Sequence, residues 1–252
     1  MTPKLLLPKA YDFQHHAVCE STMNQGFEWL KDSTRVQDSC LILADQQTAG
    51  RGRRGRSWQA CEGNAFLSLA FKVPLEVQSF SELSFVSAVA LGDTLFQLCS
   101  GLKIGYKWPN DILVEDKKVA GILIETEVQK TCRHVVVGMG VNLKEAPTLK
   151  DYKTTSIYKE TQNLITPLQL AEVLVPQFDR YKNLWLKEGF SKISREWHKH
   201  ALHLEKEIRI VTDQGAKVGV FEGLDDRGHL ALRVAPGDVQ SFSTADIVER
   251  FI

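Results

Sequence analysis

Residues 111–126, DILVEDKKVAGILIET, contain two apolar runs separated by a short charged segment. The runs 111–114 and 119–126 are rich in Ile, Leu and Val, the residue types that favour β-strands. Residues 115–118 between them are all charged, which is typical of an exposed turn. The stretch therefore predicts a β-hairpin with a polar tip, around which the rest of the chain can be placed.

Apolar segments on both sides of this hairpin predict a sheet with helices packed against it. The predicted strands are residues 40–44, 64–73 and 134–143. The predicted helices, with apolar side chains at helical spacing, are residues 21–30, 80–99 and 166–190. Ser21 or Thr22 can cap the first of these helices at its N-terminus.

The last fifty residues differ from the rest in having short β-runs separated by turns. These runs are residues 208–212, 218–224, 230–234 and 239–243. They predict a small barrel after a larger α+β domain, and we expect the boundary between residues 1–203 and 204–252.

Charge and apolar content exclude several classes of protein. The chain has 252 residues, with 31 Lys+Arg and 31 Asp+Glu, and 43% of its residues are hydrophobic. This composition is that of a globular protein and excludes disorder, while the zero net charge argues against a nucleic-acid-binding surface. The apolar runs are far shorter than the roughly 20 residues of a membrane span, so no membrane partner is expected.

The cysteines indicate a cellular compartment. Cys19, Cys40, Cys61, Cys99 and Cys132 are odd in number and form no CxxC pair. Structural disulfides are rare in reducing compartments. The expectation is therefore a cytoplasmic protein.

The segment Gly50–Trp58, GRGRRGRSW, is the most unusual of the chain, with four arginines and three glycines in its first seven residues. Glycine lets backbone N–H groups approach an anion, and guanidinium groups pair with phosphate or carboxylate. This composition predicts an anion-binding loop. The alternative is a solvated basic arm or a nucleic-acid contact.

Three further motifs follow in the order KWPND (107–111), KVAGILIE (118–125) and GMGVNL (138–143). Small polar residues before a strand, such as Asn110 and Asp111, can orient a ligand or simply form a turn. Lys118 can likewise be a functional cation or a solvated lysine. Taken singly, none of these motifs identifies a function.

Taken in this order, the motifs resemble those of the biotin–protein ligases. Residues 20–24, ESTMN, resemble the biotin-contacting opening of that family, and Gln47 precedes the arginine loop as it does there. The resemblance covers about residues 18–145 densely and the C-terminal strands loosely. It implies a mixed β-sheet with flanking helices, as in class II aminoacyl-tRNA synthetases, followed by a C-terminal SH3-like β-barrel.

The resemblance also implies a reaction. Biotin and ATP would form biotinyl-5′-AMP and pyrophosphate, and a lysine of the biotin carboxyl carrier protein of acetyl-CoA carboxylase would then accept the biotin. Mg²⁺ would neutralise the polyphosphate. No cluster of residues with metal-ligand spacing requires another ion. A sheet edge could pair in a homodimer, although no stretch of the sequence indicates one.

Roles for individual residues are implied by the same resemblance. The catalytic residues would be Arg53, which holds the phosphate, and Lys118, which touches both the biotin carboxylate and the α-phosphate. The biotin site would comprise Ser21, Thr22, Asn24, Gln47, Gly50, Arg51, Lys118, Gly121 and Ile122. The ATP and adenylate site would comprise Arg53, Arg56, Trp58, Lys107, Asn110, Asp111 and Asn142, with Trp58 packed on the adenine.

Some alternatives stay open at this stage. A lipoate-type ligase of related fold is the competing enzyme, and a nucleic-acid-binding module using the arginine loop is the competing class. Only 19 residues precede Glu20, too few for a DNA-reading domain, so we expect a ligase without repressor activity. His198, His200 and His203 lack acidic or cysteine partners at ligand spacing and are expected at the surface or the core edge.

Overall fold

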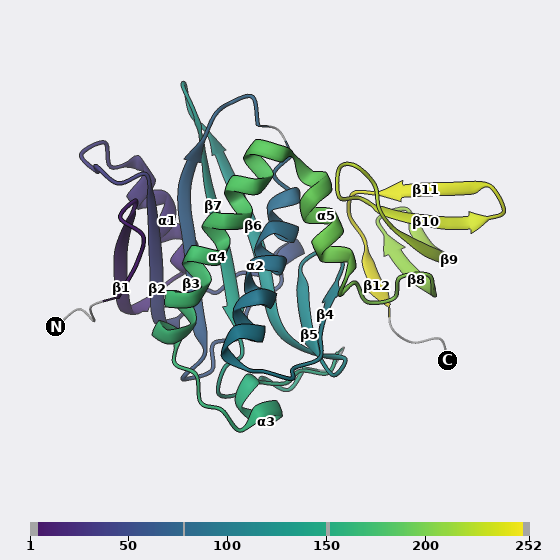
Figure 1. The fold of residues 1–252 in the computed structure, drawn as a ribbon, viewed down its shortest axis with the longest axis horizontal. Helices are drawn as coiled ribbons and strands as arrows, with labels where there is room; N and C mark the ends of the chain where they lie inside the picture. Colours follow the sequence, from purple (N-terminus) through teal and green to yellow (C-terminus); the bar gives the residue numbers. More distant parts are fainter. Residues whose placement is uncertain (1–4, 78, 150–151, 249–252) are drawn as a thin grey trace.

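The computed structural model describes residues 5–77, 79–149 and 152–248, which form two β-sheets with helices packed on the larger one (Figure 1). The larger sheet has the order β1-β2-β3-β7-β6-β5-β4. Only β1 and β2 pair in parallel, so the sheet is mixed, as predicted. Its strands are β1 (Tyr11–Cys19), β2 (Ser39–Gln47), β3 (Ala65–Val73), β4 (Ile104–Lys107), β5 (Asp111–Val114), β6 (Lys117–Val128) and β7 (Arg133–Val141).

The predicted hairpin is confirmed as β5 and β6, but its turn is shorter than expected. Glu115 and Asp116 have φ angles of 48° and 59°, in the left-handed region that turns the chain back. Strand β6 begins at Lys117, so Lys118 lies in the strand and not in the polar tip. Its backbone accepts a hydrogen bond from the Thr155 N–H, 2.9 Å away, and this fixes the base of the Lys118 side chain.

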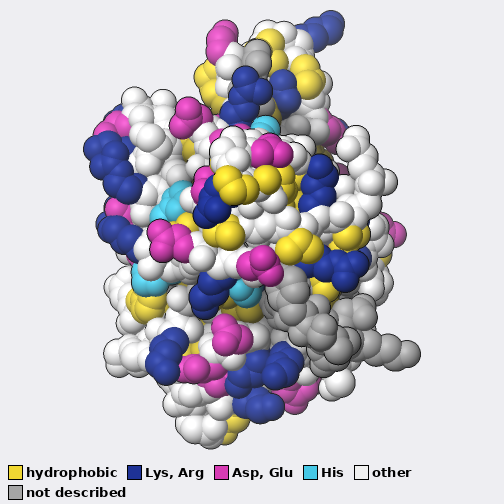
Figure 2. Space-filling view, turned by 90° about the vertical axis from the view of Figure 1, so that its right-hand side faces the viewer, with side chains coloured by type: hydrophobic (Ala, Val, Ile, Leu, Met, Phe, Trp, Pro, Cys, Tyr) yellow, Lys and Arg dark blue, Asp and Glu magenta, His cyan; other side chains and the backbone are white. Residues whose placement is uncertain are grey.

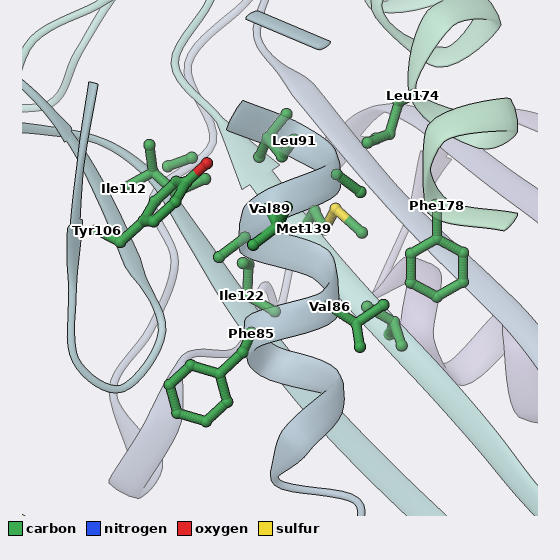
Figure 3. Close-up of a cluster of buried hydrophobic side chains, with 14 of the residues drawn as sticks. Phe85, Val86, Val89, Leu91, Tyr106, Ile112, Ile122, Met139, Leu174 and Phe178 are labelled. Carbon is green, nitrogen blue, oxygen red and sulfur yellow. The ribbon is translucent and has the colours of Figure 1, made fainter. Parts of the chain in front are cut away.

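Helices cover one face of the sheet almost completely. Helix α2 is buried on most of its surface and lies beside α4, and both helices pack on the larger sheet (Figure 3). The predicted helix 166–190 is confirmed as α4, which ends where Gly189 adopts a φ of 79°, and a separate helix α5 follows. These helices are α2 (Glu82–Leu98), α4 (Pro167–Glu188) and α5 (Phe190–His198), together with the short α3 (Ile157–Thr161).

Within the residues that the structure describes, α1 (Thr22–Lys31) is the one helix on the opposite face, and it begins at the predicted cap. The Ser21 hydroxyl accepts a hydrogen bond from the Met23 N–H at 3.3 Å. Met23, Phe27 and Leu30 pack on β2, β3 and β7 in a small separate core. The face of β6 and β5 beside this helix is therefore left for a site.

A carboxyl group is buried under the helical layer. The Glu82 side chain accepts a hydrogen bond from the Trp185 indole N–H, 2.6 Å from Oε2. Burial raises the pKa of Glu82 above its ordinary value of 4.5, against the hydrogen bonds from Trp185 and Ser79 that lower it. Desolvation therefore outweighs these hydrogen bonds in the folded protein.

Replacing Glu82 with Gln should stabilise the protein at neutral pH by up to about 1 kcal/mol, because an amide oxygen keeps the Trp185 bond without a desolvated charge. The raised pKa means that the folded state binds more protons, so the stability of the natural protein falls as pH rises from 4.5 through the folded pKa. Urea unfolding at pH 4 and pH 8 measures this. Asp38→Asn is the control. If Glu82→Gln and the natural protein lost the same amount of stability between pH 4 and pH 8, the assignment would be contradicted.

The C-terminal part is a five-stranded antiparallel sheet, in agreement with the small β-domain that was expected. Its order is β11-β10-β9-β8-β12. The strands are β8 (Glu207–Thr212), β9 (Gly215–Leu224), β10 (Leu230–Ala235), β11 (Asp238–Phe242) and β12 (Asp246–Val248). The first four correspond to the predicted runs, with ends that differ by up to three residues.

This small sheet packs on the larger part of the chain beside β4 and α5 (Figure 1). Its buried residues, including Phe221, belong to the same apolar cluster as those of α2. The Trp108 indole donates to the Gly228 carbonyl at 3.0 Å, and His198 Nε2 accepts from the Leu224 N–H at 3.1 Å. His198 and His200, which contacts the Phe96 ring, thus lie at the core edge as expected.

Basic and acidic side chains are interspersed on the side of the molecule where the C-terminal sheet lies (Figure 2). This distribution gives no field of a single sign for a polyanion on that face. None of the helices within residues 5–77, 79–149 and 152–248 is both long and apolar enough to cross a membrane.

Candidate functional site

A cavity of about 520 Å³ lies on the open face of the larger sheet, beside α1. Its walls are the arginine loop, the β6 side chains Leu123 and Glu125, and Thr244 from the C-terminal sheet. Its volume is that of a site for a small organic molecule. Both parts of the chain therefore contribute to one cavity.

The arginine loop, residues 50–58, is closed by its own backbone. The Trp58 N–H donates to the Gly50 carbonyl at 2.9 Å, and the Gly52 N–H donates to the Arg56 carbonyl at 2.7 Å. A side chain at Gly50 would place its Cβ 2.7 Å from the Trp58 carbonyl oxygen, so only glycine fits there. The loop is a tight turn with defined side-chain directions.

Two arginines of this loop donate to side chains that were also predicted for the site, those of Asn24 and Asn110. Arg51 pairs with Glu125, with Nη2 2.9 Å from Oε2, and its Nη1 donates to the Asn24 side chain at 2.8 Å. Arg53 Nη1 donates to Asn110 Oδ1 at 3.3 Å. The loop, α1 and the start of β5 are thereby connected across the cavity.

Lys118 is held beside the same strand start. Its Nζ lies 2.7 Å from Asp111 Oδ1, and the side chain is only 16% exposed. Its ammonium also lies 5.4 Å from the Trp58 ring centroid and 5.6 Å from that of Tyr152. Consecutive residues, Asn110 and Asp111, thus bring the two predicted catalytic cations together.

The electrostatics of Arg53 follow from its surroundings. Burial lowers the pKa of its guanidinium, while the nearby carboxylates of Asp246 and Asp111 raise it. The guanidinium stays charged because the ordinary pKa of an arginine lies far above neutrality. A half-buried cation of this kind interacts strongly with an anion that displaces water from it.

Trp58 lies over two glycines of the sheet. A Cβ at Gly140 would lie 2.2 Å from the indole Cε2, and one at Gly121 would lie 2.8 Å from Cζ3. These glycines pair across β6 and β7 and form a flat surface for the ring. Gly121 therefore accommodates Trp58 directly, and its predicted contact with biotin stays a prediction.

Replacing Gly140 with Ala should displace the Trp58 ring, because the added methyl group would overlap with the indole. We expect a changed near-UV circular dichroism spectrum and a loss of stability of about 1–3 kcal/mol. The spectral change should vanish in a Trp58→Phe background. Gly52→Ala is the control, since its Cβ would lie 3.4 Å from its nearest neighbour; an unchanged spectrum in Gly140→Ala would refute the ring position.

A compact polar group lies between α1 and β2, near the loop. The Thr22 N–H donates to Gln47 Oε1 at 2.7 Å, and the Thr22 hydroxyl lies 2.8 Å from that of Ser68. Ser21 is buried in its capping role. Ser68 was not predicted, because one serine within an apolar strand gives no signal without its spatial neighbours.

The side chains of two predicted site residues, Ile122 and Asn142, do not line the cavity. Strand alternation turns the Ile122 side chain toward α2 (Figure 3), and Leu123 faces the cavity in its place. The Asn142 amide is buried, where it donates to the Thr155 carbonyl at 3.2 Å and accepts from Asn64 at 3.4 Å. Asn142 thus stabilises the segment after β7, and its side chain does not line the cavity.

Arg56 lines the cavity, and Lys107 is not among the residues that line it. Lys107 ends β4, where it pairs in register with Asp111. Burial lowers the pKa of Arg56, but the Asp246 carboxylate raises it above its ordinary value, with a smaller contribution from the Tyr152 phenol. Tyr152 was not predicted, because it lies in a segment without a recognisable pattern.

Comparison with known proteins shows what the chain resembles. Residues 16–142 match the model of the biotin/lipoate A/B protein ligase family, and residues 203–249 match that of the biotin protein ligase C terminal domain. The biotin–[acetyl-CoA-carboxylase] ligase of Paracoccus denitrificans is 35% identical over 233 residues, which are 90% of this chain and 97% of that protein. The bifunctional ligase/repressor BirA of Bacillus subtilis is 31% identical over 240 residues, covering 92% of this chain and 72% of that protein.

Solved structures share the fold. The biotin protein ligase from Aquifex aeolicus in complex with biotin and ATP superposes with a TM-score of 0.78. The alignment covers 95% of this chain and 97% of that chain, at 23% identity. The larger sheet and the C-terminal sheet are therefore both parts of a known architecture.

Proposed function

Because the chain belongs to the biotin/lipoate A/B protein ligase family, we propose that it attaches biotin to protein in two steps. The biotin carboxylate first attacks the α-phosphate of ATP, forming biotinyl-5′-AMP and releasing pyrophosphate. The ε-amine of a lysine in a biotin carboxyl carrier domain, such as that of acetyl-CoA carboxylase, then attacks the acyl carbon and AMP leaves.

The observation that carries this proposal is the meeting of Arg53 and Lys118 at Asn110 and Asp111. The first step brings a carboxylate to a phosphate, two groups of like charge. Cations placed between them offset this repulsion and stabilise the charge that develops in the transition state. Two such cations, from distant parts of the sequence, contact consecutive residues at the start of β5.

Biotin requires an apolar slot with a few polar contacts. Leu123 supplies apolar surface in the cavity, and the polar group of Thr22 and Gln47 lies at the other side of the loop. We assign the ureido group of biotin to this polar group and its carboxylate to Lys118. The second step then uses Lys118 again, as the cation nearest to the acyl oxygen.

ATP enters as its magnesium complex, so Mg²⁺ is part of the substrate. Its phosphates need positive charge, which the arginine loop supplies, and the ion needs only one or two carboxylates besides them. Asp111 is the carboxylate beside the proposed phosphate position. No group of three metal-ligating side chains occurs among the residues that the structure describes.

Incubation with labelled biotin, MgATP and a purified carboxyl carrier domain tests the proposal. Covalent label on the carrier is expected, and it should be lost when the acceptor lysine is replaced by Arg. Labelled lipoate in a parallel reaction tests the competing enzyme. Transfer of lipoate without transfer of biotin would refute the proposed substrate.

We propose further that the protein is a cytoplasmic ligase without repressor activity, whose catalytic domain spans residues 1–203. The odd number of cysteines, all five with free thiols, supports the cytoplasm. Pairing of the loop arginines with Glu125, Asp213 and Asp246 supports the lack of DNA binding, since these charges are already matched. A mobility-shift assay with a salt series tests this.

A further inference from the structure

Four charged side chains join the arginine loop to the C-terminal sheet. They are Arg54 and Arg56 of the loop, Asp213 in the turn between β8 and β9, and Asp246 at the start of β12. Asp246 Oδ2 lies 3.2 Å from Arg54 Nη1 and also pairs with Arg56 Nη2, while Asp213 pairs with Arg54 Nη2. We call these four residues the Asp246 cluster.

The backbone of the loop sends its arginines in different directions. Arg54 has a φ of 55°, in the left-handed region, which reverses the chain immediately after Arg53. Arg53 donates through Nη1 to Asn110 beside Lys118 and through Nη2 to Thr244 at 3.2 Å, whereas Arg54 and Arg56 form ion pairs with Asp246. Arg53 alone of the three thus contacts the start of β5, at the proposed phosphate position, while the other two are held by the C-terminal sheet.

Asp246 is rigidly placed for this contact. Ala245 and Ile247 on either side of it are 0% and 7% exposed and belong to the apolar core. Asp213, in contrast, has a side chain that is 80% exposed and lies in a turn. Of the two carboxylates, Asp246 is the one that can define where the loop lies.

We propose that Asp246 is a positioning residue of the active site, which holds Arg54 and Arg56 on the C-terminal sheet so that Arg53 faces the phosphate. Three guanidinium groups within four residues repel one another, and the shared carboxylate offsets this repulsion. The C-terminal sheet thus controls the geometry of the nucleotide site through one side chain. The part of this inference that concerns phosphate rests on the proposed function.

Limited trypsin digestion of the protein without substrates tests the contact itself. Trypsin needs a free arginine side chain, so Asp246→Asn should be cleaved at Arg53, Arg54 and Arg56 about three to ten times faster than the natural protein. Asp246→Glu should restore slow cleavage in part. In about 0.5 M salt the difference should shrink, because the charges are partly exposed and screened.

The matched control is Asp238→Asn, which removes the same charge from β11 of the same sheet, where Asp238 contacts Gln240. It should be cleaved at the natural rate. Equal cleavage of Asp246→Asn and the natural protein would overturn the proposal. Faster cleavage over the whole chain, with a lower melting temperature, would also overturn it, because that result reports general unfolding.

Kinetics test the role of Asp246 in the active site. Asp246→Asn should raise KM for MgATP about three- to tenfold and lower kcat by a smaller factor, since Arg53 and Lys118 are both still present. An unchanged KM would overturn the positioning role. If the natural protein forms no adenylate, the proposed function fails, and the digestion still decides whether Asp246 holds the loop.

Discussion

Replacing Lys118 with Met is expected to lower the rate of biotinyl-adenylate formation about 10³-fold or more, because the side chain keeps its length but loses its charge. In the structure its ammonium lies 2.7 Å from Asp111 and beside the Trp58 ring, at the position where a carboxylate and a phosphate would meet. Isotope exchange between pyrophosphate and ATP measures this step without an acceptor protein.

The fold should survive this change. Loss of the partly exposed ion pair with Asp111 should cost about 1–2 kcal/mol, well below the stability of a typical domain. Lys103→Met is the matched control, since Lys103 is 80% exposed and pairs with Glu115 at the surface. A Lys118→Met variant that keeps more than a tenth of the natural exchange rate would remove Lys118 from the mechanism.

Secondary structure was predictable where the apolar pattern is strong. The β5–β6 hairpin, α2 and α4 follow from apolar runs and helical spacing, and the mixed sheet and C-terminal β-domain were also expected. Strand β1 was missed because its residues are half-buried and include His15 and His16, so no apolar alternation is visible. Such an edge strand is defined by its partner β2 and not by its own composition.

The membership of the site was more predictable than its geometry. The described contacts join Arg51 to Asn24, Arg53 to Asn110 and Lys118 to Asp111, which are residues of different predicted motifs. Spacing along the chain does not reveal which face of a strand a side chain occupies, so it could not show that Leu123 lines the cavity while the Ile122 side chain is buried. Their roles in binding stay predictions.

Contacts between the two parts of the chain could not be predicted at all. Thr244 and Asp246 lie almost 200 residues from the arginine loop, and no local pattern links them to it. Polar residues in a β-domain are usually solvated. Only the packing of the C-terminal sheet on the core brings these side chains to the cavity.

Replacing Arg53 with Gln should lower the rate of adenylate formation about 10²- to 10³-fold and also release the adenylate more readily. Glutamine is shorter and neutral, so the phosphate loses a charged, bidentate partner and Asn110 loses its donor. Rapid gel filtration after a single turnover measures how much adenylate stays bound. The expected result is a larger free fraction than in the natural protein.

The comparison of neighbouring arginines makes this prediction specific. Arg54→Gln removes the same charge one residue away, from a side chain that pairs with Asp213 and Asp246, so its effect should be at least tenfold smaller than that of Arg53→Gln. Arg180→Gln, on the far helical layer where Arg180 pairs with Asp93, should leave both quantities unchanged. If Arg54→Gln impaired adenylate formation more than Arg53→Gln, the phosphate would be bound by Arg54, and the directions of the loop side chains would have to be reassigned.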